Sequence, residues 1–294
     1  MSTGAPSMQD RVVVVTGANV GIGFETAASV AARGGSAVLA CRDRAKGDRA
    51  VNAIRQRTGS EHVELVPLDL ADFASVRRCA DELQTRWDRL DVLVNNAGGF
   101  WTQRQVTEQG FEQTFGVNHL GPFLLTQLLL DRLRSSAPSR IVNVSSIGHR
   151  FVRSMNWDDL QLERGYDAAV AYGQSKLANI LFARELARRL PADVVTANAC
   201  HPGSVRTGLG RDGDATGFMG TVAFGLLRPF YLSPARGAKT PIYLTTAPEV
   251  AGQTGGYYVR RRRHRPSAAA RDDDAARRLW EVSEQLVASG APAD

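Results

Sequence analysis

Short apolar runs alternate along the chain with segments that carry a helical hydrophobic pattern. Each run is nearly continuous in apolar residues rather than alternating between apolar and polar ones, which is typical of parallel strands covered on both faces. The pattern therefore predicts an α/β fold, a parallel sheet with helices on both faces. The expected strands lie at 11–16, 36–41, 63–70, 91–96, 140–146 and 193–203.

Helical patterns occupy most of the gaps between these runs. We expect one helix that begins at Phe24, a charged helix that ends near Arg57, further helices at 123–130 and 171–190, and a final helix after about Arg271. Because the chain shows no internal repeat and no low-complexity linker, we expect a single domain over 11–290, preceded by a flexible N-terminus at 1–10.

Residues 217–232, "GFMGTVAFGLLRPFYL", interrupt the alternation with an apolar, glycine-rich segment that follows a strand end. The segment could form a core helix, a membrane-touching patch or a flap over a pocket. Ligands of open parallel sheets bind beyond the carboxyl ends of the strands. We therefore favour a flap, and we expect 204–235 to cover the substrate.

The composition is that of an ordinary globular protein, with 43% hydrophobic and 22% charged residues. The net charge is +6, but five arginines between 260 and 265 supply most of it. We expect that short basic run to be a solvated loop, and no nucleic-acid partner is indicated.

Cysteine usage and hydropathy bear on the compartment. Cys41, Cys79 and Cys200 are widely spaced, which favours neither a disulfide framework nor a metal site. The first residues lack the pattern of a signal peptide, and no run approaches the roughly 20 apolar residues that span a bilayer. We expect a cytoplasmic protein with no integral membrane anchor.

The stretch "TGANVGIG" (16–23) lies between the first expected strand and the first expected helix. Gly17, Gly21 and Gly23 let the backbone turn tightly and approach a pyrophosphate, whose charge would meet the positive end of the helix. The spacing G-x-x-x-G-x-G differs from the commoner G-x-G-x-x-G. The turn predicts a dinucleotide site, although such turns also occur for structural reasons alone.

The end of the second expected strand bears on the choice of nucleotide. An NAD site usually has an acidic residue there, which binds the ribose hydroxyls. In this chain Cys41 and Arg42 occupy the place, and Lys46 follows one helical turn later. A guanidinium can bind a 2′-phosphate through paired charge-assisted hydrogen bonds, so the sequence favours NADP(H).

Tyr172 and Lys176 stand four positions apart in "AYGQSK", so on a helix they project from the same face. An isolated pair of this kind is more often a surface feature than a catalytic one. A phenol with an ordinary pKa of about 10 is a poor base at neutral pH. A nearby ammonium favours the phenolate and brings that pKa towards the working range.

Taken together, these stretches resemble the short-chain dehydrogenase/reductase family, and the resemblance covers about residues 11–260. Within the family, "ACRDRAKG", "SAPSRIVNVSS" and "SKLANILFARELARRL" are most similar to the retinol dehydrogenase branch. The matching motifs are "TGANVGIG", "LDLAD" (68–72), "NNAG" (95–98), "GVNHLG" (116–121), "NVSS" (143–146), "YGQSK" (172–176) and "HPG" (201–203).

The resemblance implies a Rossmann-type doubly wound sheet and four catalytic residues. Tyr172 would be the acid/base, Lys176 its partner, Ser146 the hydroxyl that orients the carbonyl and Asn118 the anchor of a water relay. Ser146 is preferred over Ser145 because the family's serine ends such a "VSS" stretch. The implied cofactor residues are Gly17, Asn19, Gly21, Ile22, Gly23, Arg42, Lys46, Asp69, Leu70, Asn95, Ala97, Gly98, Tyr172, Lys176, Pro202, Gly203, Val205 and Thr207.

We therefore expect an NADP(H)-dependent oxidoreductase that acts on a bulky apolar aldehyde, ketone or alcohol. A reductase of C=C double bonds and a non-catalytic NADP-binding sensor or scaffold stay open as alternatives. The resemblance also implies a homodimer or homotetramer. His119 and His201 flank motif residues, and we expect both to be packed rather than catalytic.

Overall fold

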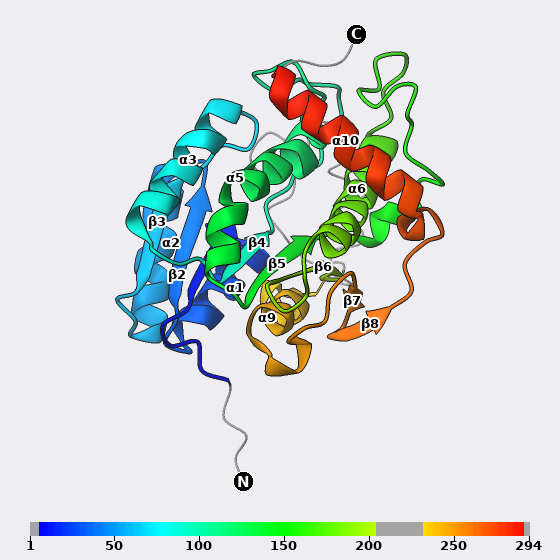
Figure 1. Ribbon diagram of the computed structural model, residues 1–294. Coiled ribbons are helices and arrows are strands. Elements are labelled where there is room, and N and C mark those ends of the chain that lie inside the picture. The colour runs from blue at the N-terminus through cyan, green and yellow to red at the C-terminus, as the bar shows by residue number, and fades with distance from the viewer. Residues whose placement is uncertain (1–5, 204–231, 291–294) are drawn as a thin grey trace.

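The computed structural model describes residues 6–203 and 232–290. Eight strands form one sheet in the order β3-β2-β1-β4-β5-β6-β7-β8 (Figure 1). All neighbouring strands are parallel except β7 and β8, which form an antiparallel hairpin. The strands are β1 (Val12–Thr16), β2 (Ser36–Cys41), β3 (Val63–Pro67), β4 (Val92–Asn95), β5 (Ser139–Val144), β6 (Val195–His201), β7 (Tyr257–Val259) and β8 (Arg262–His264).

Helices cover both faces of the sheet, as the apolar pattern predicts (Figure 1). One face packs against α3 (Phe73–Arg86), α5 (Gly121–Ser135), α6 (Ala168–Arg189) and α10 (Asp273–Ser289). The other face packs against α1 (Gly21–Ala31), α2 (Arg44–Thr58) and α9 (Lys239–Thr246). This confirms the predicted doubly wound α/β architecture.

The alternation of side chains in β1 shows why the strands read as continuous apolar runs. Val12 and Val14 pack on the side of α3, α5 and α6, whereas Val13 and Val15 pack on the side of α1 and α2. Because successive side chains point to opposite faces and both faces are covered, all four positions from Val12 to Val15 are apolar.

Three boundaries differ from the sequence-based expectation. Helix α1 begins at Gly21 rather than Phe24, so its first turn belongs to the glycine motif. Met8 is 5% exposed and donates its backbone N–H to the carbonyl of Arg33, so the packed domain includes residue 8 of the expected flexible N-terminus. The basic run is not simply a loop, because Arg262–His264 form the edge strand β8.

Most of the predicted substrate-covering segment, 204–235, and of the apolar insert at 217–232 lies outside the described residues. Two short elements follow the gap, α8 (Pro234–Gly237) and α9, and both contact α1. Among residues 6–203 and 232–290, no helix is both long and apolar enough to cross a membrane.

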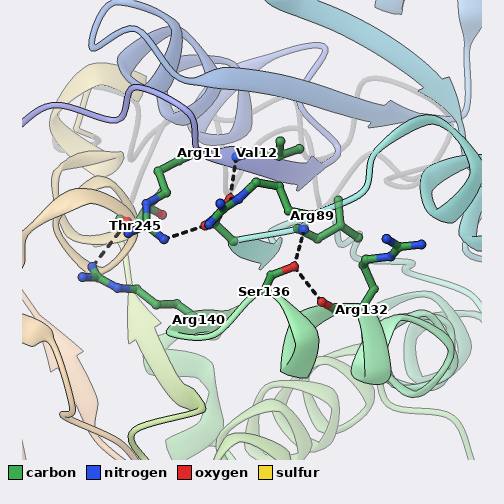
Figure 2. Close-up of polar contacts among 9 residues, drawn as sticks. Arg11, Val12, Arg89, Arg132, Ser136, Arg140 and Thr245 are labelled. Atoms are coloured by element: carbon green, nitrogen blue, oxygen red, sulfur yellow. Dashed lines mark hydrogen bonds and ion pairs between the residues drawn. The ribbon is translucent and has the colours of Figure 1, made fainter.

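The amino ends of the central strands are held by a network of charged and polar groups (Figure 2). Asp91 is 2% exposed and accepts hydrogen bonds from Arg11, Arg89 and the backbone N–H of Val12. On the neighbouring strand, the Arg140 guanidinium donates to three backbone carbonyls at the end of α9, among them that of Thr245. Each of these charges has partners, so the network joins the strands to the helices around them.

Candidate active site

The glycine-rich turn leaves the carboxyl end of β1 and leads directly into α1. Gly17 and Gly21 have φ values of +64° and +67°, in the left-handed region that favours glycine. A Cβ on Gly23 would lie 2.5 Å from Asn96 Nδ2 and 2.7 Å from the Gly17 carbonyl oxygen. Gly23 therefore has no room for a side chain, and Gly17 and Gly21 hold backbone conformations that other residues rarely adopt.

Thr16 and Asn96, each part of a motif quoted above, hold this turn against the end of β4. The Thr16 hydroxyl accepts the backbone N–H groups of Asn96 and Ala97 at 3.0 and 2.9 Å. The Asn96 side chain in turn donates to the Thr16 carbonyl at 2.8 Å. Only the pairing of two distant strand ends reveals these contacts, and a single sequence carries no signal for such a pairing.

The end of β2 presents Arg42, whose side chain is exposed. Cys41 is buried beneath the glycine turn, where burial raises the pKa of its thiol to about 11, opposed by hydrogen bonds to the backbone of Ala18 and Asn19. Lys46 lies in the first turn of α2 and forms an ion pair with Asp43 at 3.8 Å. Arg42 is therefore the exposed cation that directly follows β2.

Asp69 and Leu70 follow β3. The Asp69 carboxylate accepts the backbone N–H of Ala71 at 2.9 Å, which fixes a tight turn. Leu70 is buried, and its carbonyl oxygen lies so close to Gly121 that a Cβ there would approach within 2.5 Å. The turn thus lies at the same edge of the sheet as the glycine motif.

In the "NNAG" segment, Asn95 forms interior hydrogen bonds and Gly98 makes space for neighbouring side chains. The Asn95 side chain points into the interior, where it donates to Thr126 Oγ1 and Asn143 Oδ1. Gly98 leaves space for two catalytic candidates, since a Cβ on it would lie 2.9 Å from Asn118 Oδ1 and 3.1 Å from Lys176 Nζ. Gly98 therefore lets both side chains reach the same point.

Asn118 lies in a π-helical turn, Gly116–Leu120, between α4 (Gln113–Phe115) and α5. It is fully buried and well partnered: Nδ2 donates to the Gly99 carbonyl and to Ser175 Oγ, both at 3.0 Å, and Oδ1 accepts the Gly99 N–H at 2.8 Å. The amide thus bridges the end of β4 and α6. Single π-turns occur frequently at functional sites.

The two neighbouring serines after β5 point in different directions. Ser145 Oγ donates to the backbone carbonyl of Lys176 at 2.7 Å and is buried. Ser146 is half-buried, its Oγ accepts the Gly148 N–H at 3.1 Å, and its hydroxyl lowers the pKa of Tyr172. The structure thus brings Ser146, and not Ser145, to the phenol.

Tyr172 and Lys176 project from one face of α6 towards that serine. Lys176 Nζ lies 5.5 Å from the centre of the Tyr172 ring. Burial lowers the pKa of Lys176 to about 8. Burial raises the pKa of Tyr172, and the hydrogen bond to Ser146 opposes that increase.

The end of β6 supplies Pro202 and Gly203, and Gly203 has a φ of +93°. His201 Nδ1 accepts the N–H groups of Ile147 and Gly203 at 3.2 and 3.4 Å. Burial lowers the pKa of His201 to about 4, so the ring is a neutral acceptor at pH 7. Val205 and Thr207, the other expected cofactor contacts, lie outside the described residues.

His119 is packed, as expected from the sequence. It is fully buried among the rings of Phe115, Phe123 and Phe182, and its Nε2 is 2.8 Å from Ser283 Oγ of α10. Burial lowers its pKa to about 3.

Apolar side chains lie near the phenol of Tyr172. The Phe100 ring meets Tyr172 edge-on, with the ring centres 5.6 Å apart. Ile147 and Phe151 are 45% and 61% exposed and flank Gly148, whose Cβ position lies 2.9 Å from the Tyr172 ring. Exposed large apolar residues beside a reactive group are typical of a binding surface for apolar ligands.

Comparison with known families identifies the family of the chain. Residues 11–216 match the model of the short chain dehydrogenase family. The chain is a short-chain dehydrogenase. It is an oxidoreductase of a family that uses nicotinamide cofactors, and the resemblance inferred from the motifs is confirmed.

Relatives place the chain close to the retinol dehydrogenases. It is 46% identical to retinol dehydrogenase 13 of Homo sapiens over 96% of this chain and 86% of the relative. Retinol dehydrogenase 14 of Homo sapiens is 43% identical over 95% of this chain and 87% of the relative.

Solved structures show the same fold. A protein from Mycobacterium paratuberculosis has a TM-score of 0.75 and 36% identity, covering 99% of this chain and 98% of its own. A short chain dehydrogenase from Shigella flexneri, complexed with NADP, has a TM-score of 0.68 and 25% identity, covering 86% and 98%.

Proposed function

We propose that this dehydrogenase transfers a hydride between NADP(H) and the carbonyl or hydroxyl carbon of a bulky apolar aldehyde, ketone or alcohol. The convergence of Asn118, Ser146, Tyr172 and Lys176 beside Gly98 carries the proposal. When bound, the nicotinamide supplies or accepts the hydride. The residues of this chain bind, orient and move the proton.

Tyr172 acts as the acid/base. In reduction its hydroxyl delivers a proton to the carbonyl oxygen, while Ser146 donates a hydrogen bond to that oxygen as negative charge develops. Lys176, with a pKa lowered to about 8 by burial, is still largely an ammonium at neutral pH and stabilises the phenolate. Asn118 and Ser175 form a hydrogen-bonded link along α6, since Ser175 Oγ also donates to the Tyr172 carbonyl at 2.8 Å.

The glycine cradle and Arg42 support NADP(H) as the cofactor. The missing side chains at Gly17 and Gly23 admit a pyrophosphate at the start of α1, and the exposed Arg42 guanidinium suits a 2′-phosphate. The structure from Shigella flexneri is a complex with NADP, and a related structure from Escherichia coli is a complex with NADPH.

An apolar substrate follows from the surroundings of Tyr172. Phe100 packs against its ring, and the exposed Ile147 and Phe151 lie in the segment beside it. Burial of such a surface against a hydrocarbon substrate is favourable by about 25 cal/mol per Å². The names of the relatives, retinol dehydrogenases, point to the same chemical class.

The test is NADPH oxidation, followed by absorbance, with aldehydes and ketones from short aliphatic compounds to retinal, and with enones to detect C=C reduction. Tyr172→Phe should lower kcat by at least a hundredfold while NADPH still binds. Tyr258→Phe is the matched control, because the Tyr258 hydroxyl bonds to Gln253 away from the site.

Activity that rises with substrate apolarity and prefers NADPH to NADH would support the proposal. NADPH binding without turnover of any compound would favour a sensor. Full activity of Tyr172→Phe would contradict the assigned acid/base.

A further inference from the structure

Two histidines that take no part in the proposed proton transfer contact the turn that begins with Ser146. This turn is a single 3₁₀ turn, Ile147–Arg150, and it follows β5. His149 belongs to the turn and is fully buried. His201 is the half-buried last residue of β6, the strand that pairs with β5. The turn is thus held both from within and from the neighbouring strand.

The two rings bind opposite sides of one peptide unit, which joins Ser146 to Ile147. Its carbonyl oxygen lies 2.7 Å from His149 Nδ1. Its N–H donates to His201 Nδ1 at 3.2 Å. A carbonyl oxygen can only accept and an amide N–H can only donate, so the two contacts fix the tautomers. His149 carries its proton on Nδ1, whereas Nδ1 of His201 carries none.

Each ring also reaches a second segment of the chain. His149 Nε2 accepts the backbone N–H of Ser267 at 3.3 Å, on the connection between β8 and α10. This contact agrees with a proton on Nδ1, because an Nε2 that accepts carries none. His201 Nδ1 accepts a second N–H, that of Gly203, at 3.4 Å. The peptide is therefore tied to the carboxyl-terminal segment and to the proposed nicotinamide end of the cofactor site.

These contacts require neutral rings, and burial favours the neutral form of both. Burial lowers the pKa of His149, and it lowers the pKa of His201 to about 4. A protonated His201 would carry a hydrogen on Nδ1 and could no longer accept the N–H of Ile147. At neutral pH the peptide therefore meets one fixed donor and one fixed acceptor.

Formation of a 3₁₀ turn explains only part of this arrangement. The backbone N–H of His149 already donates to the Ser146 carbonyl at 3.3 Å, which is the bond that such a turn needs. The imidazole of His149 adds a shorter bond to the same oxygen, and His201 reaches the turn from another strand. Both ring contacts are therefore additional to the turn itself.

The turn packs closely against the helix that carries the phenol. A Cβ on Gly148 would lie 2.9 Å from the Tyr172 ring, and a Cβ on Gly173 would lie 3.1 Å from the Gly148 carbonyl oxygen. A rotation of the peptide after Ser146 would therefore move the serine hydroxyl relative to the phenol. The orientation of this peptide thus determines where the hydroxyl lies.

We propose that His149 and His201 are positioning residues, which orient the Ser146 hydroxyl towards the carbonyl oxygen of the substrate by fixing the peptide that follows the serine. This inference rests on the proposed function, in which Ser146 donates a hydrogen bond to that oxygen. The bond strengthens as negative charge develops in the transition state. Loss of either ring contact should therefore lower kcat more than it changes substrate or cofactor binding.

Paired substitutions at each histidine separate the hydrogen bond from the packing. Asparagine places an amide near the position of Nδ1, so His149→Asn keeps a donor and His201→Asn keeps an acceptor, whereas phenylalanine keeps a ring and offers neither. With a carbonyl compound that the wild type reduces, we expect His149→Phe and His201→Phe to lower kcat about tenfold. The asparagine variants should stay within about threefold of the wild type. Urea unfolding shows that each variant is folded under the assay conditions.

A double-mutant cycle with Ser146→Ala shows whether the histidines act through the serine. In the Ser146→Ala background, His149→Phe should lower kcat by less than about twofold, because no hydroxyl is left to misplace. Full kcat of the phenylalanine variants, or losses that multiply with the loss in Ser146→Ala, would overturn the inference alone. An unchanged kcat of Ser146→Ala would instead contradict the proposed function of the serine, and the inference with it.

The tautomers provide a readout that needs no substrate. The chain contains five histidines, so nitrogen NMR spectra of histidine-labelled protein contain few signals. At neutral pH we expect one ring protonated on Nδ1, whose signal is lost in His149→Phe, and a ring protonated on Nε2 whose signal is lost in His201→Phe. A proton on Nε2 of His149 or on Nδ1 of His201 would overturn the inference, whatever the activity of the enzyme.

Discussion

The two edges of the sheet treat buried charge in opposite ways. At the amino edge, Asp91 is buried with two arginines and a backbone N–H as partners (Figure 2). At the carboxyl edge, Lys176 is 5% exposed and, among the described residues, has no carboxylate partner; its ammonium lies 3.5 Å from the Val144 carbonyl. The buried charge at the amino edge is fully paired, whereas the buried ammonium of Lys176 at the carboxyl edge has only a carbonyl nearby.

The two buried charges therefore serve different purposes, Asp91 in folding and Lys176 in the proposed proton transfer. Burial alone would raise the pKa of Asp91, but the hydrogen bonds from Arg89, Val12 and Arg11 bring it below its usual 3.8. Lys176 has no such compensation, so burial brings its pKa down to about 8. A paired charge contributes to folding, whereas an under-compensated one is poised to respond to a neighbouring proton transfer.

The largest effect is expected from Lys176→Met. We expect kcat to fall by roughly a hundredfold to ten-thousandfold, because the phenolate loses its stabilising cation. The free energy of unfolding at pH 7 should not decrease, since the variant removes a desolvated charge. Steady-state kinetics and urea unfolding of the same preparation measure both. A large loss of stability with the activity retained would contradict the comparison.

Asp91→Asn should lower stability and leave turnover unchanged, the opposite of Lys176→Met. Removing this buried carboxylate should cost about 1–2 kcal/mol of unfolding free energy at pH 7, because the Val12 N–H loses a charged acceptor while Arg11 and Arg89, which are 39% and 45% exposed, regain water. Turnover of the remaining folded enzyme should stay near that of the wild type.

The pH dependence follows from the lowered pKa of Asp91. Its contribution is complete above the ordinary value of 3.8 and is lost as the pH falls through the lower folded-state pKa. The difference in urea unfolding between the wild type and Asp91→Asn should therefore shrink below about pH 4. A difference that stays constant down to pH 2 would argue against the carboxylate as its source.

The smallest effect is expected from Arg42→Ala. The KM for NADPH should rise about tenfold, while the KM for NADH should change little, because an exposed guanidinium contributes about 1–2 kcal/mol through charge-assisted bonds. Arg77→Ala, an exposed arginine on α3, is the matched control. Equal changes for the two cofactors would show that Arg42 does not discriminate between them.

Much of the fold and part of the candidate site could be predicted from local sequence patterns. The apolar runs predicted the sheet, the Tyr–Lys spacing predicted that both side chains share one helix face, and the resemblance to the family supplied the other candidate site residues. The β7–β8 hairpin was not predicted, because the three exposed residues of β8, Arg262–His264, have no apolar pattern. Thr16, Asn96 and Ser145 belong to motifs that the sequence analysis quotes, but their contacts could not be predicted because their partners lie far away in sequence.

The π-turn at Gly116–Leu120 has a consequence for the length of the chain at this point. A π-turn holds one residue more than an α-turn, and each residue of an α-helix advances about 100° around the axis. Deleting one residue here would restore an unbroken helix and rotate α4 against α5 by about that angle. Asn118 would then turn away from Gly99 and Ser175 although no catalytic group had been removed. The orientation of its amide thus depends on the number of residues in this turn as much as on their type.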